Sequence, residues 1–190
     1  MQNNNNWSSE IKSIFDTCNM SHVFESRTNC DIKFLQTVFI GNFVENWKIT
    51  IDTSPKLRTY KLFKLNFGSE CYLKSCIPRH RRSLLAQFRF GILPLHVETG
   101  RFTNVELCNR LCILCNSNAI EDEIHFICNC SFYDDLRKLL FDKVNLVLHS
   151  QHFDQLSSEE KLVILCNSFP NDLSKFIEYA FSRRKNFLYN

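Results

Sequence analysis

Residues 111–130 read LCILCNSNAIEDEIHFICNC, and the predicted organisation of the whole chain follows from this stretch. It contains Cys112, Cys115, His125 and Cys130, in the spacing C-x2-C-x9-H-x4-C. Two close cysteines, a short loop, and then a histidine and a further cysteine form a typical donor set for tetrahedral zinc. Four protein ligands leave no open coordination position, so the spacing predicts one structural Zn²⁺ rather than a catalytic ion.

Two neighbouring cysteines are alternative ligands for this site. Cys108 lies four residues before Cys112 and could replace it, and Cys128 lies two residues before Cys130. We expect Cys128 to be a core residue instead. Ordinary buried thiols in a reduced protein are the alternative to metal binding as a whole, because free cysteine is among the most buried residue types.

The composition of the chain favours a mainly α fold. Its 190 residues include 18 phenylalanines but only 4 glycines and 4 prolines, and 44% of them are hydrophobic. Few helix breakers and many large apolar side chains indicate a helical protein with an aromatic core. We therefore expect a helical domain with an inserted small CCHC zinc knuckle.

Composition and hydrophobic spacing divide the chain into four expected segments. Residues 1–29 are predicted to be a polar, partly disordered N-terminus, 30–103 a helical basic region, 104–132 the CCHC zinc knuckle, and 133–190 the C-terminal helices. Within these segments, apolar residues recur at helical spacing in 31–47, 131–148 and 172–187. We expect the buried faces of these helices to include Phe34 and Phe39, then Leu139, Leu140, Val144 and Val147, and then Leu173, Phe176, Ile177 and Ala180. Ser157 and Glu160 form the capping box of a further helix, from Ser158 to about Cys166.

The basic residues are concentrated in one part of the chain. Residues 55–103 contain ten lysines and arginines against Glu70 and Glu98, which gives this segment a net charge of +8. Such a block beside a metal site indicates a polyanionic partner, RNA or DNA. The expected nucleic-acid contacts are Lys74, Arg79, Arg81, Arg82 and Arg89. An ordinary solvated, charged surface is the alternative.

The acidic run Glu121-Asp122-Glu123 lies inside the predicted zinc loop. It argues against direct contact between this loop and phosphates, because like charges repel. We expect these carboxylates to face solvent, to hold Arg110, or to support a metal ligand.

Several classes of protein do not fit the sequence. No run of about 20 apolar residues predicts a membrane span, and the N-terminus does not resemble a signal peptide. Reduced cysteines and an intracellular location, nucleus or cytoplasm, are therefore expected. No glycine-rich phosphate loop is present, so we expect no enzyme. The sequence does not indicate a protein partner.

Residues 55–141 resemble the C-terminal region of reverse transcriptases from animal non-LTR (LINE-type) retrotransposons. The resemblance lies in a block before the cysteines, made of Phe88-Arg89-Phe90-Gly91, Leu93, Leu95, Glu98, Gly100, Arg101 and Phe102. The family's zinc knuckle then matches Cys112, Cys115, His125 and Cys130, with a loop before His125 that is slightly longer than usual.

The resemblance implies a zinc-stabilised module that binds RNA or DNA. The polymerase and endonuclease parts of such proteins lie upstream of this region, so we expect neither activity in this chain. The alternative is a non-catalytic remnant, or a protein-interaction domain in which the zinc is purely structural.

Overall fold

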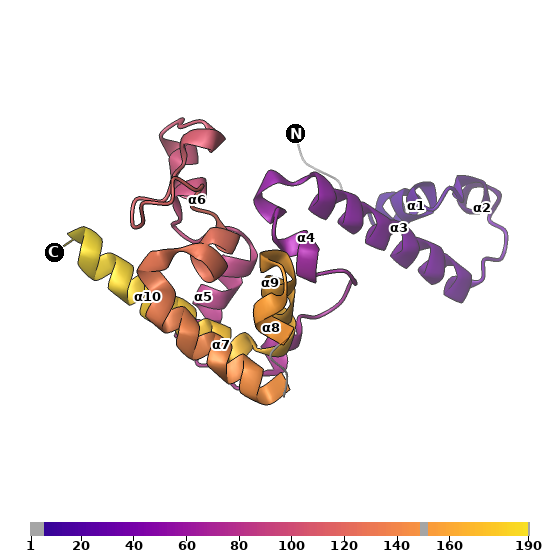
Figure 1. Cartoon of the computed structure of the whole chain (residues 1–190). Helices are drawn as coiled ribbons and strands as arrows, with labels where there is room; N and C mark the ends of the chain where they lie inside the picture. Colours follow the sequence, from indigo (N-terminus) through magenta and orange to yellow (C-terminus); the bar gives the residue numbers. More distant parts are fainter. Residues whose placement is uncertain (1–5, 149–151, 190) are drawn as a thin grey trace. The chain divides into compact units, whose positions relative to one another are not determined.

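A computed structural model describes residues 6–148 and 152–189 of the chain, which divides into two compact units, Met1–Thr53 and Ser54–Asn190. The prediction of a mainly helical protein is confirmed (Figure 1). The described residues form no β-strand, and their one isolated β-bridge joins Leu111 and Ile120. None of the helices that the structure describes combines the length and apolar character needed to cross a membrane.

The first unit is built from three helices, α1 (Trp7–Thr17), α2 (Ser21–Ser26) and α3 (Ile32–Thr53). The rings of Phe15 and Phe24 pack with their centroids 5.8 Å apart and join α1 to α2. The Asn42 side chain donates a hydrogen bond of 2.8 Å to the Thr17 carbonyl and joins α3 to α1. The N-terminal segment that was expected to be polar and partly disordered thus contains α1 and α2, and its residues 1–5 lie outside the described part of the chain.

Helix α3 differs from its prediction in length and in burial. It continues to Thr53, six residues beyond the expected end, and includes Gly41 in its interior. The side chains of Phe34 and Phe39 were expected in the core, but they are exposed.

The second unit contains seven α-helices among its described residues. They are α4 (Tyr60–Phe63), α5 (Arg79–Arg89), α6 (His96–Phe102), α7 (Asp134–Leu148), α8 (His152–Gln155), α9 (Ser158–Ser168) and α10 (Pro170–Tyr189). Short 3₁₀ turns lie at Pro55–Leu57, Cys71–Lys74, Leu107–Asn109 and Ser131–Tyr133. The segments expected at 104–132 and 133–190 thus share one unit with residues from Ser54 onward, and the unit boundary falls inside the expected segment 30–103.

Helix α10 is the central packing element of this unit. It contacts α5, α7 and α9, and Figure 1 shows it beside α7. Its buried face comprises Leu173, Phe176, Ile177 and Ala180, as the spacing predicted. Burial of each large apolar side chain contributes about 1.5–3 kcal/mol. The helix begins at Pro170, two residues earlier than expected, because proline fits the first helical turn.

Helices α9 and α7 test two further predictions. The capping box before α9 is confirmed, because the Ser157 hydroxyl accepts a hydrogen bond from the Glu160 backbone and the Glu160 carboxylate accepts one from Ser157. In α7, Leu140 and Val144 are buried as expected. Leu139 and Val147 were assigned to the same buried stripe, but they are exposed.

Candidate metal centre

A tight turn brings the first two cysteines together. Around the Leu111–Ile120 bridge, the Cys112 backbone donates to the Ala119 carbonyl at 2.8 Å, and the Glu121 backbone donates to the Arg110 carbonyl at 2.9 Å. These bonds close the loop that contains Cys115. A loop was predicted between Cys115 and His125, and the Leu111–Ile120 bridge closes the base of its first part.

The other two predicted ligands lie at the two ends of a single π turn, His125–Asn129, which begins at His125 and is followed directly by Cys130. The Cys130 backbone donates to the His125 carbonyl at 2.8 Å, which is the i→i+5 bond of a π turn. The Asp122 carboxylate accepts a 2.7 Å hydrogen bond from the His125 backbone at the start of the turn. This wider turn brings residues five apart onto one side, and sequence periodicity alone did not indicate it.

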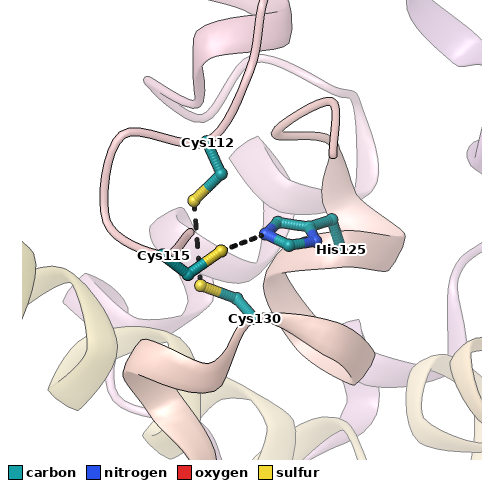
Figure 2. A group of neighbouring side chains, drawn as sticks. All are labelled: Cys112, Cys115, His125 and Cys130. Carbon is teal, nitrogen blue, oxygen red and sulfur yellow. Dashed lines mark hydrogen bonds between the residues drawn. The ribbon is translucent and has the colours of Figure 1, made fainter. Parts of the chain in front are cut away.

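The four predicted ligands converge. One donor atom from each of Cys112, Cys115, His125 and Cys130 lies within 4.8 Å of all the others. The Cys112 and Cys130 sulfurs are 3.8 Å apart, and the Cys115 sulfur lies 3.3 Å from His125 Nε2. Figure 2 shows the four side chains pointing toward one another, with these two contacts drawn as dashed lines. This group can hold a metal ion.

Two of the observed separations, 3.8 Å between the Cys112 and Cys130 sulfurs and 3.3 Å between the Cys115 sulfur and His125 Nε2, are close to those of a tetrahedral zinc site. Bonds of about 2.3 Å to sulfur and 2.0–2.1 Å to nitrogen place two sulfurs about 3.8 Å apart, and a sulfur and a nitrogen about 3.5 Å apart. Cys112, His125 and Cys130 are buried and Cys115 is half-buried, so solvent has limited access to the group.

The four side chains also compete for protons. The hydrogen bond between the two buried sulfurs lowers the pKa of Cys112 to about 3 and raises the pKa of Cys130. The contact with Cys112 raises the pKa of His125 above its ordinary value. A thiolate beside protonated neighbours is the arrangement in which a cation can replace protons.

Glu121, the first residue of the acidic run, is buried beside the predicted ligands instead of facing solvent. Glu121 is 1% exposed, and its carboxylate accepts a 2.7 Å hydrogen bond from the His96 backbone and two from Arg184. One of its oxygens lies 3.8 Å from the Cys112 sulfur. The expectation that this carboxylate faces solvent or holds Arg110 is therefore wrong, and it instead contacts Cys112, one of the four predicted ligands.

Glu123 is buried in the same way. Its carboxylate pairs with Arg58 at 2.6 Å, and burial raises its pKa. The partner is 65 residues away in the sequence, so no local pattern could indicate the pair.

The two alternative cysteines do not join the group. The exposed Cys108 thiol lies 3.9 Å from the Glu106 carboxylate. Cys128 donates to the Ser158 carbonyl at 3.6 Å, and burial raises its pKa to about 11. Among the described residues, the cluster comprises the four predicted ligands and neither of these cysteines.

The predicted nucleic-acid contacts lie in and just before α5. Lys74 and Arg79 are exposed, and neither pairs with a carboxylate in residues 6–148 or 152–189. Arg82 is half-buried and donates to the Ile77 carbonyl at 3.0 Å. Arg81 lies 3.9 Å from the Glu178 carboxylate of α10. These residues share one region of the unit.

The prediction that Arg89 contacts nucleic acid is wrong, because its side chain is buried and does not face solvent. It is 2% exposed and pairs with Glu70 at 2.5 Å. It also donates to the Cys166 carbonyl at 3.0 Å, and its guanidinium lies 4.3 Å from the centroid of the Phe63 ring. A buried arginine needs such partners, so it belongs to the core and is not accessible to a phosphate.

Part of the positive charge of the +8 segment is neutralised within the protein. Six of its basic side chains form ion pairs with carboxylates, namely Lys56, Arg58, Lys64, Arg81, Arg89 and Arg101. Two of the partners, Glu123 and Glu178, lie outside the segment, so a local charge count overstates the free positive charge.

The block that carries the family resemblance has a structural role here. Gly91 has φ +64°, and a Cβ atom at this position would lie 2.4 Å from the Lys56 carbonyl oxygen. Glu98 is buried and pairs with Lys56 at 3.3 Å and with Arg101 at 3.0 Å. These residues position the chain around α6, beside the metal group.

Comparisons with known proteins add no family to this description. No protein-family model, curated protein or solved structure matches the chain. The resemblance to retrotransposon reverse transcriptases therefore stays a prediction that depends on the motif residues alone.

Proposed function

We propose that the chain is a zinc-stabilised helical module, in which Cys112, Cys115, His125 and Cys130 hold one structural Zn²⁺. The observation that carries this proposal is the convergence of four donor atoms from two separate turns within 4.8 Å. Three sulfurs and one imidazole nitrogen are ligands that zinc prefers, and they complete its tetrahedral coordination.

The metal would lock the two turns to the surrounding helices. Arg137 of α7 donates to the carbonyls of Ile127 and Cys130 at the π turn, and Glu121 joins the first loop to Arg184 of α10. Metal affinity at such a site becomes folding free energy, because the unfolded chain does not hold the four ligands together.

Metal content tests this proposal directly. The purified wild-type chain should contain one equivalent of zinc by elemental analysis, and Cys115→Ser should lose it. Cys108→Ser is the matched control and should retain the metal, because its thiol lies outside the cluster. A wild-type chain without zinc, or a Cys115→Ser variant with a full equivalent, would contradict the proposal.

We further propose that the module binds RNA or DNA, with no catalytic activity of its own. The support comes from the exposed cations Lys74 and Arg79, from the adjacent Arg82, and from the resemblance to a nucleic-acid-binding region. Arg81 contributes once it is released from Glu178. Cationic side chains on one surface attract the phosphates of a nucleic acid.

The salt dependence of binding tests the nucleic-acid proposal. Phosphate contacts release counterions, so log Kd against log salt should have a clear slope. The triple variant Lys74→Ala/Arg79→Ala/Arg82→Ala should flatten it, whereas Lys138→Ala on α7 should not. A wild-type slope near zero would exclude phosphate contacts.

A protein-interaction domain is the second candidate, and one observation favours it. On α7, Leu139 and Leu146 are 70% and 75% exposed, and they lie seven residues apart on one face. Exposed apolar faces of this kind mark interaction surfaces. If the zinc-loaded chain ignores nucleic acid and associates with a protein, Leu139→Lys/Leu146→Lys should abolish that association.

A further inference from the structure

A pocket of about 630 Å³ lies beside the candidate metal centre. Three parts of the chain form its walls. Pro94 lies just before α6 and Thr99 lies within it, Ile113 lies between Cys112 and Cys115, and the last turns of α10 supply residues from Phe181 to Tyr189. Its size is within the range of pockets that bind small molecules, about 300–1,000 Å³.

The Glu121 carboxylate connects all three walls. It accepts a hydrogen bond from His96 in α6, contacts Cys112 next to Ile113, and pairs with Arg184 in α10. Cys112 is also a proposed zinc ligand. The shape of the pocket is therefore coupled to the metal centre through one buried side chain.

The lining of the pocket is mostly apolar. On α10, Phe181, Lys185, Leu188 and Tyr189 have the spacing i, i+4, i+7 and i+8, so they lie on one face of the helix. In the loop between Cys112 and Cys115, the lining residue Ile113 is 59% exposed. An apolar group that enters here gains about 25 cal/mol for each Å² that it removes from water.

The charges around the pocket have one sign. Its two charged lining residues are Arg184 and Lys185, and no carboxylate lines it among the described residues. Arg184 is already neutralised by Glu121. Lys185 is exposed and forms no ion pair with any residue that the structure describes, so it is available to an anion from solution.

We propose that this pocket binds a small apolar ligand with one anionic group, which lies against Lys185, and that the metal centre maintains its shape. The proposed dependence of the pocket's shape on metal rests on the Zn²⁺ proposed above. The proposed chemistry of the ligand rests only on the residues that line the pocket. Neither statement requires that the chain bind nucleic acid.

Fluorescence of 8-anilinonaphthalene-1-sulfonate, an aromatic anion, tests the pocket in the full zinc-loaded chain. The wild type should show one saturable site. Ser182→Trp places an indole in the pocket and should weaken binding at least tenfold. Asn186→Trp adds the same side chain outside the lining and should have no effect. If the wild type lacks a saturable site, or Ser182→Trp keeps wild-type affinity, the dye binds elsewhere and the proposal is wrong.

A charge reversal tests the role of Lys185. Decanoate should displace the dye from the wild type at about two- to fivefold lower concentration than decylamine, the size expected for an exposed ion pair. Lys185→Glu should reverse this preference, whereas Lys138→Glu on α7 should not. A preference that Lys185→Glu leaves unchanged would overturn the assignment of the anion to Lys185.

The metal dependence has its own test. Zinc content is measured for every variant, and zinc-free Cys115→Ser should lose the saturable, decanoate-sensitive site. A zinc-free variant that keeps this site with full affinity would overturn the coupling. If the wild type contains no zinc, the proposed metal fails, and the ligand site is decided by Ser182→Trp and Lys185→Glu.

Discussion

The Glu121 carboxylate lies 3.8 Å from the Cys112 sulfur while it accepts two hydrogen bonds from the Arg184 guanidinium. The two charged residues are 63 positions apart in the sequence. Both are buried, so one contact joins the predicted zinc loop to the last helix.

Removal of the Glu121 charge should destabilise the second unit strongly. Glu121→Gln leaves the buried Arg184 without a counter-charge, which costs about 3–5 kcal/mol. Urea denaturation should show this loss. Glu121→Leu/Arg184→Met should be more stable than Glu121→Gln, because it leaves no unpaired charge. Equal stability of all these proteins would show that the pair contributes little.

Arg89 should be needed for stability and not for nucleic-acid contact. Arg89→Ala leaves Glu70 without its nearest cation and should cost about 3–5 kcal/mol in the free energy of unfolding. At a temperature where the variant remains folded, its salt slope for RNA binding should equal that of the wild type. If Arg89→Ala reduced the slope of log Kd against log salt by about one, Arg89 would contact a phosphate and this prediction would be wrong.

Asp135 and Arg183 predict a pH dependence at the junction of α7 and α10. The Arg183 guanidinium lowers the pKa of Asp135 to about 2, below the ordinary value of 3.8. Since the folded-state pKa is the lower one, the stabilisation is complete above about pH 4 and is lost as the pH falls through about 2. The difference in urea midpoint between the wild type and Asp135→Asn should therefore shrink on acidification. A difference that is constant from neutral to acidic pH would contradict this.

Two glycine substitutions should act in opposite directions. Gly91→Ala forces a side chain into a left-handed backbone position and against the Lys56 carbonyl, so it should destabilise by more than 1 kcal/mol. Gly41→Ala lies inside α3 with no other atom within 4 Å of the new Cβ, so it should stabilise that helix by about 0.5–1 kcal/mol. Thermal unfolding measures both, and a stabilising Gly91→Ala would exclude the close contact.

Removal of the metal should lower the stability of the second unit. A chelator added to the wild type should reduce its thermal midpoint by several degrees, because zinc binds only the folded arrangement of ligands. The same chelator should leave the midpoint of Cys115→Ser unchanged. A chelator effect of the same size in both proteins would indicate a different metal site.

The local features of the sequence predicted the local features of the structure. The spacing of three cysteines and one histidine identified a group that the fold brings together, and Ser157 with Glu160 identified the start of α9. Both patterns lie within short stretches of chain. Their outcome therefore depends little on the rest of the fold.

The failed predictions share a long-range cause. Helical spacing within α5 predicted that Arg89 faces solvent. Its partners Glu70 and Cys166 come from other elements, so the spacing of α5 alone could not indicate that they bury it. The acidic run was expected to face solvent, because its partners Arg58 and Arg184 are distant in the sequence and no local pattern indicates them. The opposite error occurred for Leu139 in α7, which has helical spacing but no covering element in the described structure.

The π turn at His125–Asn129 determines where the chain can change its length. Insertion of one residue between His125 and Cys130 would place them six positions apart, one more than the π turn brings onto one side, and would move the Cys130 sulfur away from the cluster. The loop that contains residues 116–118 has no such requirement, since lengthening a loop changes its closure entropy only slowly. Insertions should therefore be tolerated between Cys115 and His125 but not between His125 and Cys130. The number of residues in the first interval can change while the number in the second stays fixed.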